Sequence, residues 1–332
     1  MKKSSTTVDS EFLDKRQVPV RDGSLPMVSV VMPVFNQEKY VADATKSILR
    51  QTFTDFELII VDDGSTDRTV EIVRGFDDSR LRLIRKEHTG FISTLVSGYK
   101  EAKGFWIARM DSDDLCSPDR FERQIRFLEN HPECAFVGTA YGHITPNGYC
   151  IKPQGQFEWR YISPAEITLG GRVFGDPTVI FRRDLAERVG FYDPEFNNEN
   201  PLWYRLLRES KGAVLGDPLY LVRWLVTSLS RSSSQEFIGS ERGSNAFLRI
   251  RDKYDPENAV KLKRSPHLSL DDAVTGKLKK GLAIYLSAGD RTAAIRLTWD
   301  GWRVNPFSFV RLKLLAYALM GVTGLRTGPN PV

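Results

Sequence analysis

Cysteine is scarce in this chain. Only three cysteines, Cys116, Cys134 and Cys150, occur among 332 residues, and none belongs to a CxxC pair. Disulfide scaffolds need a dense, even set of cysteines and structural zinc sites need closely paired ones, so the pattern argues against both. We therefore expect free cysteines and a reducing cytoplasm as the compartment.

Long apolar runs are missing as well. The best candidate, Leu314–Val322, is apolar for only nine residues, whereas a membrane-spanning helix needs roughly 20. Residues 1–26 are mainly polar and charged and lack the apolar centre of a signal peptide. We expect no membrane span, and a flexible tail over residues 1–26.

The chain also lacks a strong net charge of either sign. The 47 lysines and arginines exceed the 42 aspartates and glutamates only slightly, giving a net charge of +5. This excess favours mild attraction to anionic partners and argues against a dedicated nucleic-acid surface. A length of 332 residues predicts one large α/β domain with an appended segment, or two domains.

Strand patterns and helix patterns alternate along the first part of the chain. The apolar run Val28–Val34 is followed by residues 40, 41, 44 and 48 at helical spacing, and then by the apolar run Leu58–Val61. Further strands are predicted at 81–84 and 105–110, and further helices from about residue 66, at 92–102 and at 118–130. This alternation predicts an α/β fold with a mostly parallel central sheet and helices on both faces.

The alternation weakens in the second half. Strands are predicted at 134–141 and 177–181, helices at 183–189 and 201–210, and a loop rich in Gly and Pro at 142–155. After a serine-rich linker near residue 230, helices are predicted at 238–254, 270–288 and 293–302. We divide the chain into residues 27–230, with halves 27–115 and 116–230, and a basic helical C-terminal extension over 231–332.

Two acidic clusters follow predicted strands. Asp111-Ser112-Asp113-Asp114 comes directly after the apolar run 105–110, and residues 62–67 (DDGSTD) come after Leu58–Val61. Ligands of parallel sheets gather at the carboxyl ends of strands, and hard cations such as Mg²⁺ or Mn²⁺ take oxygen ligands. A divalent cation site is one interpretation and a surface acidic turn is the other. An EF-hand is excluded because its later ligands are absent.

Four motifs in one order give a more specific indication. They are residues 28–36 (VSVVMPVFN), Gln51-Thr52-Phe53 to Glu57, residues 61–67 (VDDGSTD), and residues 111–114 (DSDD) with Pro118-Asp119-Arg120. In order and spacing they resemble the family 2 glycosyltransferases, and a weaker resemblance continues to about Ser230. The resemblance implies a GT-A type fold and inverting transfer of a sugar from a nucleotide-diphosphate donor. It also implies a divalent metal, Mn²⁺ or Mg²⁺, as cofactor.

The resemblance implies roles for residues at the predicted strand ends. Asp113 falls at the position of the metal-binding carboxylate, and Asp111 would face the ribose or share the metal. Asp63 falls at the position that accepts a hydrogen bond from the nucleotide base. The residues whose backbone would line the base pocket are Pro33, Val34, Phe35 and Asn36.

Other acidic residues of these clusters are interpreted as structural. Asp62 and Asp67 are expected to serve as turn and N-cap residues. Asp114 is expected to cap the helix that begins near Pro118.

Inverting transfer also needs a general base for the acceptor hydroxyl. The family supplies it from a Glu-Asp pair ahead of a helix, followed six residues later by Arg. Here Asn198 stands for the Glu, Glu199 for the Asp, and Arg205 is the arginine. We predict Glu199 as the base. The alternative is that Glu199 only stabilises the start of the helix, with Asp193 or Glu195 acting in its place.

The chain departs from the family pattern at further positions. Leu95-Val96 replaces an Arg-Asn pair near the donor, and Leu225 replaces a histidine associated with the metal or phosphates. Arg223 is predicted to pair with the donor pyrophosphate, or alternatively to form a structural salt bridge. The four histidines show no ligand spacing and are interpreted as surface or loop residues; they are His88, His131, His143 and His267.

The last hundred residues mix basic and aromatic side chains, including Lys279, Lys280, Trp299 and Trp302. Helices of this composition can lie at a membrane interface, and a helical cap with a solvated basic face explains the same pattern. The resemblance implies a nucleotide-sugar donor and a glycan or lipid-linked acceptor in surface polysaccharide biosynthesis. We expect a cytoplasmic protein with peripheral contact at the inner face of the cytoplasmic membrane, and no nucleic-acid partner.

A second class of function is left open, namely a catalytically silent subunit that binds a nucleotide sugar or glycan in a polysaccharide assembly system. The altered Asn198-Glu199 and Leu95-Val96 positions favour it, whereas the intact Asp63, Asp111 and Asp113 oppose it. A sugar-phosphate nucleotidyltransferase shares the sheet and the metal. That enzyme class needs an N-terminal Gly-rich loop, and residues 28–36 contain no glycine.

Overall fold

The structure is a computed structural model. It describes residues 23–146, 148, 150–151, 157–168, 174–192, 196, 199–225, 253, 282, 294–295, 298–299 and 309–320. Most of the helices predicted beyond residue 230 lie outside these ranges, as does most of the tail predicted over residues 1–26.

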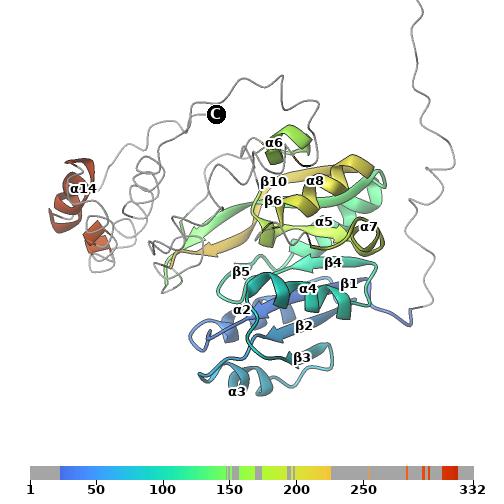
Figure 1. The fold of residues 1–332 in the computed structure, drawn as a ribbon, viewed down its shortest axis with the longest axis horizontal. Coiled ribbons are helices and arrows are strands. Elements are labelled where there is room, and N and C mark those ends of the chain that lie inside the picture. Colours follow the sequence, from blue (N-terminus) through green and yellow to red (C-terminus); the bar gives the residue numbers. More distant parts are fainter. Residues whose placement is uncertain are drawn as a thin grey trace, which may run out of the picture.

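The first half alternates strands and helices as predicted (Figure 1). Its elements are β1 (Val28–Val34), α2 (Val41–Leu49), β2 (Phe56–Asp62), α3 (Thr69–Arg74), β3 (Leu81–Arg85), α4 (Phe91–Glu101), β4 (Trp106–Arg109), β5 (Leu115–Cys116) and α5 (Arg120–Asn130). Each predicted helix and strand of residues 27–130 is therefore confirmed to within a few residues.

The second half adds strands that the sequence pattern did not predict. Its elements are β6 (Cys134–Ile144), β7 (Cys150–Ile151), β8 (Trp159–Ile162), α6 (Pro164–Thr168), the 3-10 turn η1 (Asp176–Thr178), β9 (Ile180–Arg182), α7 (Arg183–Val189), α8 (Asn200–Glu209) and β10 (Lys211–Arg223), and a later helix, α14, spans Phe309–Met320. The loop predicted from residue 142 begins later, because β6 continues to Ile144. The strand predicted at 177–181 begins at Ile180, because Pro177 lies in the preceding 3-10 turn.

One sheet runs through both halves in the order β3-β2-β1-β4-β9-β6-β10-β5, with β7 beside β6 and β8 beside β10. The pairings give one direction to β3, β2, β1, β4, β6 and β10, whereas β9, β5, β7 and β8 run the opposite way. The predicted α/β class with a mostly parallel sheet is confirmed. The antiparallel β9 joins β4 of the first half to β6 of the second.

Helices cover both faces of the sheet, so the residues of β1 and β2 are buried on both sides. Val30 and Met32 of β1 face a core that includes α2 and α5, whereas Val31 faces a second core that includes α4. Gly98 allows α4 to lie close to the sheet, since a Cβ at this position would lie 2.4 Å from Cγ1 of Val31. The loops that carry the acidic clusters begin where the packed strands β2 and β4 end.

Helix α14 is the last element that the structure describes. Its Leu314, Leu315 and Ala318 are buried. In the part of the chain that the structure describes, we find no helix with the length and apolar character needed to cross a membrane.

Candidate active site

The candidate residues gather at the carboxyl ends of β2, β1 and β4. Val34 at the end of β1 pairs with Asp62 at the end of β2, and the amide of Asp63 donates a hydrogen bond to the carbonyl of Val34 at 2.9 Å. The amide of Met110, just after β4, donates to the carbonyl of Val31 at 3.1 Å. Asp63, Phe35 and Asp111 therefore follow three neighbouring strands at one edge of the sheet, where ligands of parallel sheets bind.

Asp63 is a densely hydrogen-bonded carboxylate at this edge. Its Oδ1 accepts from Nζ of Lys86 at 2.7 Å and from the amide of Thr89 at 2.9 Å, and its Oδ2 accepts from the amide of Gly90 at 2.9 Å. Burial alone would raise the pKa of Asp63, but these donors outweigh it and hold the pKa at about 2. Gly90 has a φ of +92°, which suits glycine and lets the loop turn its amide toward Asp63. Asp63 is therefore ionised and rigidly held.

Phe35 and His88 form an aromatic pair beside Asp63. Their ring centroids lie 4.3 Å apart with an interplanar angle of 30°. Nδ1 of His88 lies 2.9 Å from Oδ2 of Asp63. His88 is an exposed loop residue, as predicted, but its contacts with Phe35 and Asp63 were not predicted. Its position three residues after the end of β3, beside the end of β2, was the signal that could have located it.

The other residues predicted to line the base pocket flank this pair. Pro33 and Val34 are buried in β1, whereas Phe35 and Asn36 are exposed after it. Asn36 has a φ of 51°, and its Oδ1 accepts a hydrogen bond from the amide of Thr66 at 2.9 Å. The loop after β1 is thereby fixed to the loop after β2. A role for these residues in nucleotide binding stays a prediction.

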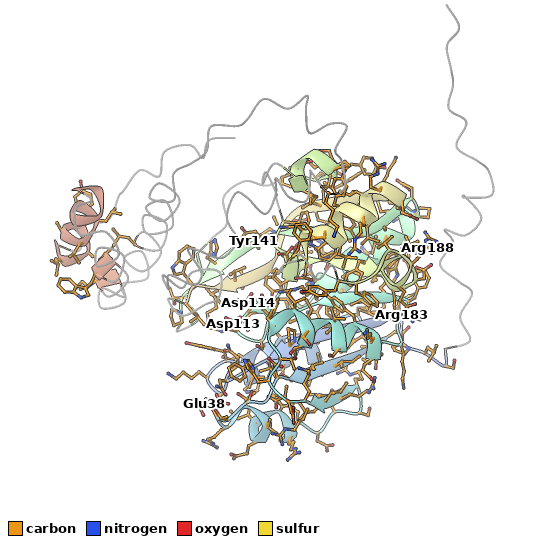
Figure 2. The ribbon with its side chains drawn as sticks, viewed as in Figure 1. Glu38, Asp113, Asp114, Tyr141, Arg183 and Arg188 are labelled. Atoms are coloured by element: carbon orange, nitrogen blue, oxygen red, sulfur yellow. The ribbon has the colours of Figure 1, made fainter. Side chains whose placement is uncertain are left out.

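The acidic triplet lies where the two halves of the sheet meet, and Figure 2 labels Asp113 and Asp114 there. Asp111, Asp113 and Asp114 bring carboxylate oxygens within 4.8 Å of one another. Burial, followed by the negative charges of Asp113 and Asp111, raises the pKa of Asp114 well above its ordinary value. A crowded set of acidic groups with oxygen ligands alone suits a hard divalent cation such as Mg²⁺ or Mn²⁺. The residues present therefore fit the metal that the resemblance implies.

Asp114 does not cap α5, contrary to the prediction. That helix begins at Arg120, and its N-cap residue is Asp119. Oδ1 of Asp114 instead accepts a hydrogen bond from the amide of Arg223 in β10, at 2.7 Å. Asp114 therefore joins the acidic loop of the first half to the last strand of the second.

Arg223 supports the same loop from the other side. Its Nε donates to the carbonyl of Asp113 at 2.7 Å, and its Nη1 donates to the carbonyl of Pro146 at 2.9 Å. Its guanidinium lies 4.8 Å from the ring centroid of Tyr40, and the residue is buried. These contacts give Arg223 a structural role, and binding to a pyrophosphate stays a prediction.

Arg109 connects the acidic loop to Glu199. From the last position of β4, its Nη1 donates to Oδ1 of Asp111 at 2.8 Å, and its Nε lies 2.7 Å from Oε2 of Glu199. Burial would lower the pKa of Arg109, but Asp111 and Glu199 outweigh it and raise the pKa well above its ordinary value. Arg109 is thus a buried cation shared by two carboxylates. Sequence reasoning missed it, although an arginine within an apolar strand was the available signal.

Glu199 lies at the start of α8 and is buried. Its Oε1 accepts a hydrogen bond from the hydroxyl of Tyr99 at 2.8 Å. Burial raises the pKa of Glu199 to about 7; Arg109 opposes the rise and Asp176 adds to it. A carboxyl group with a pKa near neutrality can both accept and release a proton at physiological pH. The alternatives to Glu199, Asp193 and Glu195, lie outside the described residues.

Asp176 is a further acidic residue near Glu199 that the sequence analysis did not single out. Its Oδ1 accepts a hydrogen bond from Nε1 of Trp203 in α8, at 2.8 Å. Trp203 is fully buried and packs edge to face against Phe181 of β9. The start of α8, and with it Glu199, is therefore anchored to the sheet.

His131 and His143 each contact an aromatic residue. His131 stacks on Phe127 with centroids 4.3 Å apart. His143 lies within β6 and packs edge to face against Trp224, so it belongs to a strand, contrary to the loop interpretation. His267 lies outside the described residues.

Comparisons with known proteins identify similar chains. The family model described as Glycosyl transferase family 2 matches residues 29–190. The putative glycosyltransferase EpsE of Bacillus subtilis is 31% identical over 210 residues, which cover 60% of this chain and 73% of EpsE. The uncharacterized glycosyltransferase RP339 of Rickettsia prowazekii is 26% identical over 269 residues, which cover 77% of this chain and 81% of RP339. A crystal structure of S. aureus TarS 1-349 in complex with UDP-GlcNAc has a similar fold, with a TM-score of 0.54 and 19% identity, covering 89% of this chain and 87% of that one.

Proposed function

Because this chain belongs to the family 2 glycosyltransferases, we propose that it transfers a sugar from a nucleotide-diphosphate sugar to a hydroxyl group of a glycan or lipid-linked acceptor. We propose that the transfer inverts the anomeric configuration and serves surface polysaccharide biosynthesis. The UDP-GlcNAc bound to TarS, a protein of similar fold, supports a nucleotide sugar as donor. A lipid-linked acceptor would place the reaction at the inner face of the cytoplasmic membrane.

One observation carries this proposal. Glu199, a buried carboxyl group with a pKa of about 7, is joined through Arg109 to Asp111 of the acidic triplet. Inversion requires a base near the donor, on the side from which the acceptor attacks. In this reaction Glu199 takes the proton of the acceptor hydroxyl while that oxygen bonds to the anomeric carbon. The bond from the anomeric carbon to the phosphate oxygen breaks, and the nucleoside diphosphate leaves with the electron pair.

The acidic triplet supplies the donor side. Asp111 and Asp113, with Asp114 behind them, would hold the divalent cation, for which we propose Mn²⁺ or Mg²⁺. When bound, such a cation neutralises negative charge that develops on the departing diphosphate. Arg109 and Arg223 keep the triplet in place through Asp111 and through the backbone of Asp113.

The nucleotide base would bind at the ends of β1 and β2. Asp63 offers an ionised carboxylate there, and Phe35 offers an exposed aromatic face. Aromatic faces and fixed hydrogen-bond acceptors together suit a flat, polar heterocycle. We therefore assign the base to Phe35, Asn36 and Asp63, and the adjoining backbone to Pro33 and Val34.

The test uses the full chain with UDP, GDP, dTDP and CDP sugars, each with and without Mn²⁺, and a panel of glycan and lipid-linked acceptors. We expect metal-dependent release of one nucleoside diphosphate and, by NMR, a product of inverted anomeric configuration. A product of retained configuration would overturn the inverting mechanism. Tight, metal-dependent nucleotide binding without any transfer would instead support the catalytically silent subunit.

A further inference from the structure

Both carboxylate oxygens of Glu199 already have a buried partner. Oε1 accepts from the hydroxyl of Tyr99 at 2.8 Å, and Oε2 lies 2.7 Å from Nε of Arg109. All three residues are less than a tenth exposed. A hydrogen bond from α4 and an ion pair from β4 therefore restrain the carboxylate.

Tyr99 reaches Glu199 from the opposite half of the molecule. It lies on α4, 100 positions earlier in the chain, and its ring packs against Phe181 and Phe191, with centroids 5.3 and 5.5 Å away. Burial, followed by the negative charge of Glu199, raises the pKa of Tyr99 well above its ordinary value. Tyr99 therefore stays protonated and donates its hydrogen bond throughout the working pH range.

Arg109 adds a connection that Tyr99 lacks. Its single positive charge is divided between Glu199 and Asp111, and its guanidinium lies 5.2 Å from the ring centroid of Phe91. Because the charge is shared, any change at Asp111 alters how strongly Arg109 attracts Glu199. The other acidic group that acts on Glu199 is Asp176, from the turn before β9.

We propose that Tyr99 and Arg109 are positioning residues that hold the base Glu199 between them, and that Arg109 couples Glu199 to the state of Asp111. This inference rests on the proposed function, in which Glu199 is the base and Asp111 belongs to the donor and metal site. Occupation of the donor site at Asp111 thereby changes the proton affinity of Glu199 and the strength of its contact with Arg109. The acceptor is then activated only beside a bound donor.

Removing a partner of Glu199 and removing Asp111 should shift the pKa of Glu199 in opposite directions. Y99F and R109Q each remove a partner that favours the charged carboxylate, so the pKa of Glu199 rises by roughly one unit. D111N removes a nearby negative charge and leaves Arg109 to Glu199 alone, so the pKa of Glu199 falls. A purely structural role for Arg109 would not give shifts of opposite sign.

The first measurement follows the ¹³C resonance of the Glu199 side chain against pH, with glutamate labelled and the resonance assigned by its loss in E199Q. This readout needs no turnover. Two matched controls remove equivalent contacts elsewhere. Y161F removes the hydrogen bond from Tyr161 to Glu133, and R82Q removes an arginine that contacts both Glu57 and Glu101. Both controls should leave the titration of Glu199 unchanged.

The second measurement is turnover against pH with a saturating donor. For Y99F we expect kcat at pH 7 to fall about fivefold, with recovery at higher pH and an unchanged donor KM. R109K should restore more activity than R109Q, because it keeps the charge. R109Q leaves two carboxylates without their partner and risks unfolding, so Y99F, which removes only one hydroxyl, keeps the test decisive.

The outcomes separate this inference from the proposed function. Unchanged titration of Glu199 in Y99F and D111N overturns the inference, whatever the enzyme's activity. Shifts of the expected sign in a protein that transfers no sugar would support the arrangement around Glu199 and overturn the proposed function.

Discussion

The rings of Phe35 and His88 stack with centroids 4.3 Å apart, a separation that leaves no room for a third ring between them. His88 also approaches Oδ2 of Asp63 at 2.9 Å. The imidazole thus occupies one aromatic face and one acceptor that a nucleotide base would use. We infer that His88 must move away before a base can stack on this face of Phe35.

We expect H88A to bind the matching nucleoside diphosphate about three to ten times more tightly than the wild type. The reason is that an aromatic pair contributes roughly 0.5–1.5 kcal/mol, which the ligand no longer has to break. Isothermal titration calorimetry measures the effect. H131A is the control, because His131 stacks on Phe127 at the same centroid distance away from the strand ends. Weaker binding by H88A would show instead that His88 contacts the base.

The pKa of Glu199, about 7, predicts the pH dependence of turnover. A base must be deprotonated, so kcat/KM, which reports the free enzyme, should rise with pH through about 7 and level off above it. E199Q should lower kcat by roughly 10² to 10⁴ and remove this rise, while donor binding stays within about twofold. E187Q, at an exposed glutamate that pairs with Arg183, is the matched control. Normal turnover by E199Q would mean that another residue is the base.

Asp113 tests the metal site. We expect D113A to abolish both the Mn²⁺-dependent part of donor binding and turnover, because one oxygen ligand of the triplet is lost. Calorimetric titration of the donor nucleotide with and without Mn²⁺ gives the metal-dependent part directly. D43A, at an exposed aspartate of α2, should behave as the wild type. Metal-dependent binding that survives in D113A would move the cation away from the triplet.

Asp63 should stabilise the fold in a pH-dependent way. Its pKa is lowered from 3.8 to about 2 in the folded protein, so its contribution is fully present above pH 3.8 and is lost as the pH falls toward 2. A shift of this size corresponds to about 2 kcal/mol of unfolding free energy. The difference between wild type and D63N, measured by urea unfolding, should therefore shrink by that amount between pH 5 and pH 2. A constant difference over this range would contradict the assigned pKa, and D43N serves as the control.

Residues 27–130 could be predicted well because their periodicity is local. Apolar runs such as Val28–Val34 are bounded by turn residues, and each run became one strand. Strand β10 was not predicted, because Gly212, Gly216 and Pro218 interrupt its apolar pattern. Its identity as a strand depends on pairing with β6, which begins almost eighty residues earlier in the chain and so leaves no local trace.

The residues of the candidate site that could be predicted are those that belong to a sequence motif. Asp63, Asp111 and Asp113 stand at strand ends, and the structure places them at one edge of the sheet as expected. Arg109 and Tyr99 belong to no motif. Their importance comes from contacts with Glu199 made across about 90 and 100 residues of chain, which no spacing along the sequence reveals.

The short strand β9 has a consequence for synthesis of the protein on the ribosome. β4 needs β9 as its second neighbour, and β9 spans Ile180–Arg182, about 70 residues after β4. Until residue 182 has been made and has emerged, one edge of β4 has unpaired backbone N–H and C=O groups, which are prone to pairing with another nascent chain. Residues 27–115 can thus begin to fold early, but their part of the sheet is protected only after translation has passed far into residues 116–230.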